Sequence, residues 1–330
     1  MVGQKLELVL TSFSDPNGLY QRTRFRMSEW LSGYAEERKT FLNRHGYPLN
    51  LDDPRSFSEK VCWRKIYDRN PLLPRIVDKY AVRKYVIESL GEREASRVLV
   101  PLLFETREPA KIPFQTISGN YIIKANHGSN MNLIVLADTE IQTQPIVERC
   151  EKWLTTPYGF FWHEWAYQQV ERRIVVERLL HDGESKPPQE CKFQMFRGKC
   201  EIIQILNSAT WYDGVSDFGT SSMPSLTYFT ADWSWLNVSW KYHWLDAAYP
   251  VEPAQRPPEN LDEMLALAER LAQPFDYIRV DLYETSNGIK FGELTPYHLS
   301  GSGAITPVTF DYELGEKWRL PAHRLRGNRS

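Results

Sequence analysis

The residues with the clearest potential for chemistry lie near the C-terminus, on two stretches in which apolar and polar positions alternate. This alternation predicts two strands that each bury one face. The polar face of the first stretch carries Arg279 and Asp281, and that of the second carries Glu293 and Thr295. Carboxylate oxygens on neighbouring strands suit Mg²⁺, which takes one or two carboxylates together with substrate phosphates.

The turn between the two stretches determines which of these side chains lie opposite one another. A three-residue loop over 286–288, with Gly288 in the left-handed conformation, is a common hairpin connection. It pairs the two carboxylates directly, and the arginine with the threonine, whereas a two-residue turn would mix the faces. Carboxylates about 5 Å apart repel each other unless a cation lies between them. The alternative is a solvated hairpin face with an Arg–Asp ion pair, and the hairpin alone leaves both interpretations open.

A second candidate site follows a strand predicted at 121–125. Lys124 lies near the end of this strand and supplies positive charge, and N–H groups of the small polar loop after it can fold over phosphate oxygens. The loop is not a Walker A motif, because no G-x-x-x-x-G-K-[ST] pattern occurs. An ordinary hairpin with a surface lysine is the alternative. The loop residues are Asn126, His127, Gly128 and Ser129.

Glu177 places a carboxylate inside an apolar strand predicted at 173–180. A buried carboxylate needs a partner. The exocyclic amine of adenine would serve, and so would Arg172 or Arg178. From Glu177 alone, a salt bridge with an arginine is favoured over a contact with adenine.

Other charged residues also have both a structural and a functional interpretation. Glu190 and Lys192 are by default a solvated charge pair. Asp78 begins a predicted helix and is first a candidate cap. Lys79 and Arg83 lie four residues apart, so they share one helix face. No serine lies in the context of a nucleophile elbow, which leaves nucleophilic hydrolysis unsupported.

The chain contains 11 tryptophans, and five of them lie between Trp211 and Trp244. Such an aromatic segment either packs a loop onto the core or stacks sugars or bases. Few lysines or arginines interleave with it, which disfavours nucleic-acid stacking.

The composition is that of a globular protein. The 330 residues are 42% hydrophobic and 25% charged, which allows two or three packed subdomains. A formal net charge of −2 gives no general attraction to nucleic acid or to anionic membranes. The four cysteines lack metal-site spacing and are expected to be reduced thiols of a cytoplasmic protein. We expect neither a signal peptide nor a membrane span, since apolar runs are too short.

The periodicities predict helices and strands that do not alternate strictly, which is typical of an α+β protein. Helices are predicted at 21–44, 59–67, 78–90 and 261–272, and 141–165 is predicted to be mostly helix with an interruption near 157–159. Strands are predicted at 98–104, 121–125, 132–136, 173–180, 192–197 and 200–206, before the hairpin at 277–295.

Taken in order, six short motifs between about 54 and 315 resemble the TupA-like branch of the ATP-grasp superfamily. That branch is linked with the synthesis of teichuronopeptide and other surface polysaccharides. The motifs are Phe57-Ser-Glu-Lys60, Asp78-Lys-Tyr-Ala-Val-Arg83, Ile123-Lys-Ala-Asn-His-Gly128, Val176-Glu177, Arg279-Val-Asp281 and Gly292-Glu-Leu-Thr295.

The resemblance implies an α+β ATP-grasp fold in which two α+β lobes clasp a nucleotide after a helical N-terminal region. A mainly helical region would cover 1–95, and a small lobe with the phosphate loop would cover 96–180. A large lobe with the Mg²⁺ site and an aromatic-rich insertion would cover 181–330.

The resemblance also implies roles for matching residues. Arg279 would stabilise an acyl-phosphate and the tetrahedral intermediate, and Lys124 would be catalytic through its contact with phosphate. The metal ligands would be Asp281, Glu293 and Thr295. The nucleotide would contact Lys79, Lys124, Asn126, His127, Gly128, Ser129, Glu177, Arg178, Leu179, Leu180, Glu190 and Lys192.

The implied activity is ADP-forming carboxylate–amine ligation with ATP and Mg²⁺, joining an amino acid to another amino acid or to a sugar acid of a surface polysaccharide. A phosphotransferase is one alternative. A carbohydrate-binding or glycosyltransferase-associated protein, working through its tryptophans, is the other. The chain departs from the superfamily at Thr295, where asparagine is usual, and from the branch at Glu190-Cys191-Lys192, where Asp-Tyr-Lys is usual.

Overall fold

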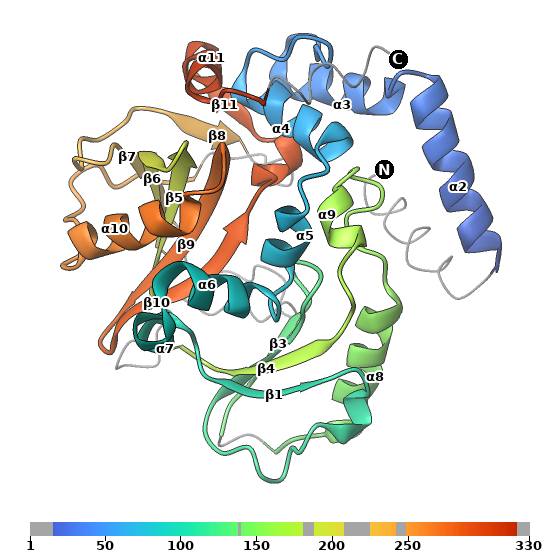
Figure 1. Ribbon diagram of the computed structural model, residues 1–330, viewed down its shortest axis with the longest axis vertical. Coiled ribbons are helices and arrows are strands. Elements are labelled where there is room, and N and C mark those ends of the chain that lie inside the picture. The colour runs from blue at the N-terminus through green and yellow to red at the C-terminus, as the bar shows by residue number, and fades with distance from the viewer. Residues whose placement is uncertain (1–15, 138–139, 181–187, 208–224, 242–248, 322–330) are drawn as a thin grey trace.

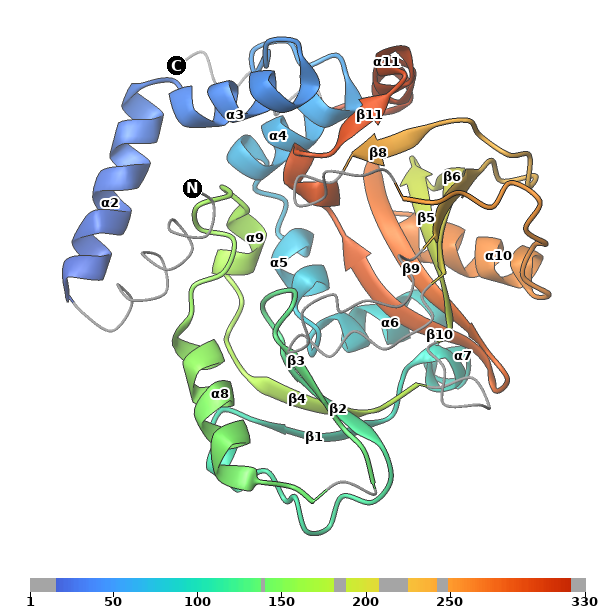
Figure 2. The same ribbon diagram turned by 180° about the vertical axis from the view of Figure 1, so that it is seen from behind.

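The computed structural model describes residues 16–137, 140–180, 188–207, 225–241 and 249–321. Two antiparallel sheets, one of four strands and one of five, form the framework of this part of the chain. They lie apart, with helices of the N-terminal third between and beside them (Figures 1 and 2). The fold therefore combines helices and sheets without strict alternation, as the sequence predicts.

The four-stranded sheet has the order β1-β4-β2-β3. Its apolar face packs against a helix, α8, and a short 3-10 turn, η1, and the side chains of Ile123, Val176 and Cys150 are fully buried there. The bounds are β1 Leu102–Thr106, β2 Tyr121–Ala125, β3 Asn132–Val135, β4 Ile174–Arg178, α8 Thr143–Thr155 and η1 Pro109–Lys111.

The five-stranded sheet has the order β10-β9-β5-β6-β7 and two chemically different faces. One cross-strand row, Val280–Phe193–Ile203, is fully buried within the core that also contains helix α10. The adjacent row on the opposite face, Asp281–Lys192–Gln204, is polar. The bounds are β5 Gln189–Phe196, β6 Lys199–Asn207, β7 Ser225–Phe229, β9 Tyr277–Thr285, β10 Gly288–Thr295 and α10 Leu261–Ala272.

The N-terminal helices contribute directly to the core of the five-stranded sheet. Helix α4 begins with a capping box, in which Ser56 and Glu59 satisfy each other's backbone N–H groups. Phe57 and Val61 of this helix share one hydrophobic core with the strands. The helices are α2 Pro16–Leu31, α3 Ala35–His45, α4 Phe57–Tyr67, α5 Leu72–Val77, α6 Val82–Leu90 and α7 Glu92–Val98.

The remaining elements lie near one end of the five-stranded sheet, except α9, which packs against α5. Strands β8 and β11 pair with each other, and α11 packs against α4 (Figure 2). Their bounds are α9 Trp165–Gln168, β8 Ser239–Lys241, η2 His298–Gly301, β11 Ala304–Thr306 and α11 Val308–Lys317.

The periodicity predictions are confirmed best where a segment is long and strongly patterned. The helix at 261–272 and the strand at 121–125 have the predicted bounds. The single helix predicted at 21–44 is wrong, because Gly33 and Tyr34 adopt left-handed conformations and separate α2 from α3. The strand predicted at 98–104 begins at Leu102, because the residues before it form α7.

The predicted helix at 78–90 begins late, at Val82. Asp78 still acts as a cap, since its carboxylate accepts hydrogen bonds from the N–H groups of Tyr80 and Ala81 at 2.8 and 3.2 Å. The intervening residues form a turn and not the first turn of the helix.

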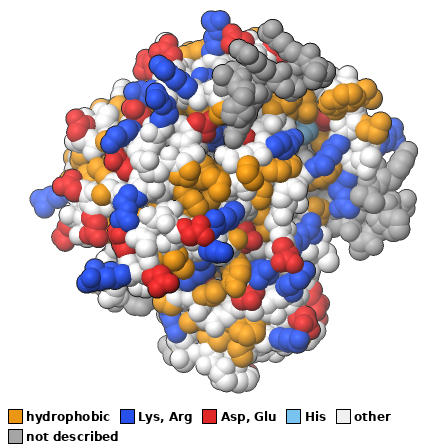
Figure 3. Space-filling model, viewed as in Figure 1, with side chains coloured by type: hydrophobic (Ala, Val, Ile, Leu, Met, Phe, Trp, Pro, Cys, Tyr) orange, Lys and Arg blue, Asp and Glu red, His pale blue; other side chains and the backbone are white. Residues whose placement is uncertain are grey.

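The surface and the thiols agree with the composition. Basic and acidic side chains are interspersed over the face in Figure 3, so no single sign of charge dominates it. The four cysteines are free, and three of them are buried. Within the described ranges, none of the helices combines the length and the apolar character that a membrane crossing needs.

Candidate functional site

The hairpin of β9 and β10 brings the predicted side chains together. Asp281 is paired with Glu293, and Arg279 with Thr295, which confirms the predicted register. The predicted three-residue loop is wrong in detail, because Gly288 already pairs with Thr285 and only two residues turn the chain. The register is restored further along the hairpin by a bulge between Phe291 and Glu293.

Gly292 occupies the bulge, where two strands approach closely. A Cβ atom at this position would lie 2.8 Å from the ring of Tyr283 and 3.0 Å from the carbonyl oxygen of Asp281. The first contact is shorter than real Cβ atoms make and the second is unusually tight, so glycine permits the bulge and the carboxylate pairing that follows from it.

Arg279 bridges the two carboxylates. Its Nε donates to Oδ1 of Asp281 at 2.7 Å, and its Nη2 donates to Oδ2 of Asp281 at 2.6 Å. The same Nη2 donates to Oε1 of Glu293 at 2.8 Å. Thr295 donates its hydroxyl to that oxygen at 2.9 Å. The arginine therefore compensates the repulsion that the sequence predicts between the carboxylates.

Lys192 extends this group onto strand β5. Its Nζ lies 3.0 Å from Oδ2 of Asp281 and 2.7 Å from Oε1 of Glu190. Glu190 also accepts from the hydroxyl of Tyr283 at 3.0 Å. The interpretation of Glu190 and Lys192 as a solvated pair is wrong, since their side chains are 17% and 12% exposed. We call the group of Arg279, Asp281, Glu293, Thr295, Lys192 and Glu190 the hairpin cluster.

Two residues that the sequence did not single out complete the environment of Arg279. His298 of η2 is buried, and its Nδ1 lies 3.2 Å from Nη1 of Arg279 and 3.3 Å from the amide of Gln194. Gln194 in turn accepts from the hydroxyl of Tyr277 at 2.6 Å. The alternation Glu190, Lys192, Gln194 along β5 was a signal for the glutamine. The histidine follows an irregular segment and has no such signal.

Burial and mutual attraction set the protonation states of the hairpin cluster. Burial works against ionisation of Glu293, but Arg279, Lys79 and Lys192 lower its pKa to about 2. Burial likewise opposes the charge of Lys192, yet Asp281 and Glu190 raise its pKa to about 12. Burial, Arg279 and Lys192 lower the pKa of His298 well below its ordinary value. The cluster thus contains ionised pairs beside a neutral imidazole.

A second charged group lies on the four-stranded sheet. We call its three residues, Glu177, Lys124 and Arg83, the small-sheet cluster. Glu177 of β4 pairs with Lys124 of β2 at 2.9 Å and with Arg83 of α6 at 3.2 Å. The salt bridge favoured for Glu177 is present, but the expected partners were wrong. Arg172 donates to the carbonyl of Leu154 instead, and Arg178 to those of Ser118 and Asn120.

The loop after Lys124 is held firmly by its neighbours. The amide of Asn126 donates to Asp78 at 2.8 Å and accepts from the backbone N–H of Arg173 at 2.8 Å. His127 is also buried, which lowers its pKa to about 4. Gly128 is buried against the ring of Tyr158, and only Ser129 is exposed. Contact of this loop with phosphate remains a prediction.

Lys79 connects the two clusters. Its ammonium donates to the carbonyl oxygen of Gly128 at 2.5 Å. Burial lowers the pKa of Lys79, and so does the nearby charge of Lys124. The carboxylates of Glu293 and Glu177 raise it. The pKa of this one lysine is therefore influenced by charged groups of both sheets.

Leu179 and Leu180 continue from β4, beyond Glu177. The backbone N–H of Leu179 donates to the carbonyl of Asn120 at 3.1 Å, and its side chain is buried. Leu180 is half-buried. Adenine contact for these residues remains a prediction.

Asp281, Glu293 and Thr295 offer the oxygen ligands that Mg²⁺ takes when substrate phosphates complete its shell. The Glu293 side chain is 41% exposed, so its oxygens can be reached, whereas Thr295, whose hydroxyl contacts Glu293, is buried. Both oxygens of Asp281, in contrast, accept hydrogen bonds from Arg279 or Lys192. Across the described ranges, no group of three or more His, Cys, Asp or Glu forms a metal site by itself. These oxygen-bearing side chains therefore fit a Mg²⁺ site that substrate phosphates complete better than a site made by the protein alone.

The described tryptophans of the aromatic segment mainly pack. Trp233 stacks on Phe229 with ring centroids 4.3 Å apart, and Trp240 is buried, whereas Trp235 is 43% exposed. Trp211 and Trp244 lie outside the described residues.

Comparison with known proteins identifies the family to which this chain belongs. The sequence model of the TupA-like ATP-grasp family matches residues 59–319. The chain belongs to this family, and its fold is an ATP-grasp fold. No curated protein matches the sequence.

Several solved ligase structures are similar to the chain at low identity and with TM-scores below 0.5. The D-alanine–D-alanine ligase of Bacillus anthracis is 14% identical, with a TM-score of 0.38 over 73% of this chain and 58% of that one. The Helicobacter pylori enzyme is 14% identical, with a TM-score of 0.40 over 80% and 68%. The VanG D-Ala:D-Ser ligase of Enterococcus faecalis is 11% identical, with a TM-score of 0.36 over 73% and 54%. The chain spans little more than half the length of the first of these structures, and the family assignment rests on the family model alone.

Proposed function

We propose that the protein is an ATP-dependent carboxylate–amine ligase that forms ADP and an amide through an acyl-phosphate. The observation that supports this proposal is Lys79, whose ammonium donates to the carbonyl of Gly128 in the candidate phosphate loop and whose pKa is influenced by Glu293 of the hairpin cluster and by Lys124 and Glu177 of the small-sheet cluster. Charged groups of both sheets would thus act on one phosphoryl group, as phosphoryl transfer between two lobes requires. In this proposal 96–180 form the small lobe and 181–330 the large lobe, after a helical region at 1–95.

The chain's residues would contribute positioning and charge. Lys79 and Lys124 would bind phosphate oxygens, and Glu177 would turn from its cations to the adenine amine. Arg279 would bind the reacting carboxylate and the oxyanion that develops from it. Asp281, Glu293 and Thr295 would hold Mg²⁺, which neutralises charge on the transferred phosphoryl group. Each contact would stabilise charge that develops during the reaction, so no covalent nucleophile is needed.

The remaining nucleotide contacts would come from backbone and side-chain groups around these anchors. They are Asn126, His127, Gly128, Ser129, Arg178, Leu179, Leu180, Glu190 and Lys192. The family's link with surface polysaccharides supports an amino acid, or a sugar acid of such a polymer, as substrate in the cytoplasm.

Calorimetric titration with ATP and Mg²⁺ tests the proposal. The wild-type protein should bind, and Glu293→Gln and Asp281→Asn should each weaken binding at least about tenfold, the loss typical when even indirect partners of a metal are removed. Glu269→Gln is the matched control, since this exposed carboxylate pairs only with Lys199 among the described residues. Lack of binding by the intact protein at millimolar nucleotide would end the proposal. Hydroxamate formation in the presence of hydroxylamine would then identify the acyl-phosphate and separate ligation from phosphorylation of a hydroxyl.

A further inference from the structure

The most exposed large hydrophobic side chains of the described residues lie together on helix α2. Leu31 is 70% exposed, Trp30 69% and Met27 57%, and every other large hydrophobic residue that is described is less than 50% exposed. Residues three and four apart in a helix share a face, so Trp30 and Leu31 both lie beside Met27. We call these three residues the α2 patch. Helix α2 lies at the edge of the molecule in both ribbon views (Figures 1 and 2).

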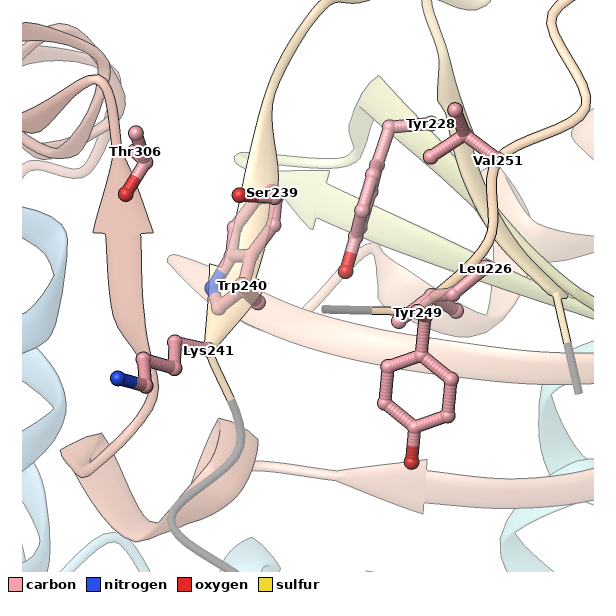
Figure 4. A pocket seen from close by; sticks show the side chains of 8 residues that line it. All are labelled: Leu226, Tyr228, Ser239, Trp240, Lys241, Tyr249, Val251 and Thr306. Carbon is pink, nitrogen blue, oxygen red and sulfur yellow. The ribbon is translucent and has the colours of Figure 1, made fainter. Parts of the chain in front are cut away.

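The aromatic side chains around a pocket beside β7 are placed in the opposite way (Figure 4). Trp240 and Tyr228 line this pocket, are 4% and 2% exposed, and have ring centroids 4.7 Å apart. Trp30, in contrast, keeps more than two thirds of its surface exposed. Exposed hydrophobic side chains that are gathered in one place indicate an interaction site, whereas single ones do not.

The opposite face of α2 fixes the helix to the rest of the chain. Phe25 packs against the rings of Phe160 and Phe161, whose centroids are 6.2 and 5.1 Å from its own. Glu29 is buried, and one of its carboxylate oxygens lies 3.4 Å from Nε2 of His163. The inner face of α2 is thus occupied, and the α2 patch points away from it.

The exposed charges beside the α2 patch are positive. Residues 22–31 contain three arginines and one glutamate, and that glutamate is the buried Glu29. Arg24 and Arg26 are exposed, and Arg24 forms no ion pair with any described residue. The net charge of −2 for the whole chain therefore does not describe this local surface, which attracts anions.

Apolar side chains flanked by arginines fit an anionic lipid surface better than a second copy of the chain. Two copies joined through the α2 patch would bring their arginines together, and like charges repel. On a membrane, tryptophan and aliphatic side chains enter the headgroup region, and arginines are attracted by the anionic lipids. The 16 residues of α2 extend about 24 Å, less than the hydrocarbon core of about 30 Å, so the helix would lie on the membrane and not cross it.

We propose that α2 docks the protein onto the surface of an anionic membrane. Met27, Trp30 and Leu31 enter the headgroup region, and Arg24 and Arg26 bind lipid phosphates. The docking is reversible and sensitive to salt, because few apolar side chains take part and exposed charges are screened. It is independent of the proposed ligase function, since no residue of the hairpin cluster or the small-sheet cluster lies on α2.

Co-sedimentation of the whole chain with lipid vesicles tests the proposal. Binding should be at least about tenfold stronger to vesicles in which part of the phosphatidylcholine is replaced by phosphatidylglycerol than to phosphatidylcholine alone. Salt at about 1 M, where the screening length is about 3 Å, should remove most of this difference.

Two substitutions on α2 separate the apolar and the electrostatic contribution. Trp30→Ser should weaken binding at least about tenfold, because the largest inserted side chain is lost. Arg24→Gln should weaken it about fivefold, the weight of one basic residue near an anionic membrane. The matched controls are Trp235→Ser, at a tryptophan that is 43% exposed, and Arg93→Gln, at an exposed arginine of α7. Both controls should bind as the wild type does.

Urea denaturation of Trp30→Ser should match that of the wild type, since the side chain is exposed, so that lost binding reports the surface and not the fold. Equal binding to the two kinds of vesicle, or binding that Trp30→Ser leaves unchanged, would overturn the proposal. So would a dimer in solution that Trp30→Ser dissociates, in the absence of vesicle binding, because the α2 patch would then join two copies of the chain.

Discussion

The hairpin cluster and the small-sheet cluster contain the same kinds of residues but hold them differently. In the hairpin cluster Asp281 is fully buried, and Arg279 and Lys192 saturate its two oxygens. In the small-sheet cluster the side chains of Lys124 and Arg83 are 26% and 19% exposed, although both pair with Glu177. Asp281 is thus closed off from solvent, although Glu293 of the same cluster is 41% exposed, whereas the small-sheet cluster is partly open to solvent at its cations.

This difference shows which charges can change partners at low cost. Ion pairs that solvent reaches are typically worth about 0–1 kcal/mol. Lys124 is partly exposed, and Arg83 stays beside the buried Glu177, so Lys124 can move to a phosphate oxygen without leaving that carboxylate unpaired. A buried pair that loses one partner leaves an uncompensated charge and costs far more. The hairpin cluster therefore suits fixed positioning of Arg279, and the small-sheet cluster suits an adaptable contact to a nucleotide.

Removal of one arginine from each cluster tests this comparison with the largest expected effect. Arg279→Met leaves the buried Asp281 with Lys192 as its remaining cation and should lower the free energy of unfolding by about 3–5 kcal/mol. Arg83→Met removes a solvent-reached partner of Glu177 and should lower it by about 1 kcal/mol or less. Urea denaturation of both variants measures the difference. Equal losses would mean that the two clusters are held in the same way.

Much of the large sheet could be predicted because its polar and apolar faces differ in sequence. The alternation along 277–295 predicted the pairing of Asp281 with Glu293, which the structure has. The route to that pairing could not be predicted, since a bulge at Gly292 and a loop of different length give the same partners. A glycine in a strand indicates a bulge only when its neighbours are known in space.

The small-sheet site was harder to predict because its contacts join distant segments. Glu177 pairs with Arg83, which lies in a helix almost a hundred positions earlier. No local pattern in the sequence distinguishes Arg83 from Arg172 or Arg178 as a partner. The sequence predicts a small polar loop after Lys124. It is anchored by Asn126, whose partner Asp78 is itself a turn cap. Tertiary hydrogen bonds, which sequence periodicity does not encode, decide both cases.

His127 allows a test of whether the loop near the small-sheet cluster is as closed as the hairpin cluster. Burial keeps its pKa at about 4 in the folded chain, below the ordinary value of about 6.5. The unfolded chain therefore binds a proton as the pH falls from 7, while the folded chain does not. Stability is lost in that range, by about 2 kcal/mol at pH 5 from this group.

His127→Gln keeps a donor for the carbonyl of Thr156, which His127 Nε2 contacts at 3.2 Å, and removes the titrating group. Its free energy of unfolding should decrease by about 2 kcal/mol less than that of the wild type between pH 7 and pH 5. Denaturation at both pH values measures the two slopes. Parallel slopes would show that the loop opens enough for His127 to be protonated in the folded state.

Thr295 gives the smallest expected effect and tests how the hairpin cluster is completed. Its hydroxyl donates to the same Glu293 oxygen that accepts from Arg279. This hydrogen bond helps to lower the pKa of Glu293, after the larger opposing effect of burial and the attraction of Arg279, Lys79 and Lys192. Thr295→Val should therefore raise that pKa from about 2 and cost about 1 kcal/mol of stability.

Thr295→Ser separates the hydroxyl from the methyl group that valine also carries. If the hydrogen bond is responsible, serine restores the low pKa of Glu293 in an NMR titration, and valine does not. If serine shifts this pKa and valine does not, the γ-methyl packing of Thr295 controls the carboxylate instead. Glu293 would then be held ionised by Arg279, Lys79 and Lys192 without the hydroxyl, and the hairpin cluster would resemble the small-sheet cluster in having one carboxylate that depends only on its cations.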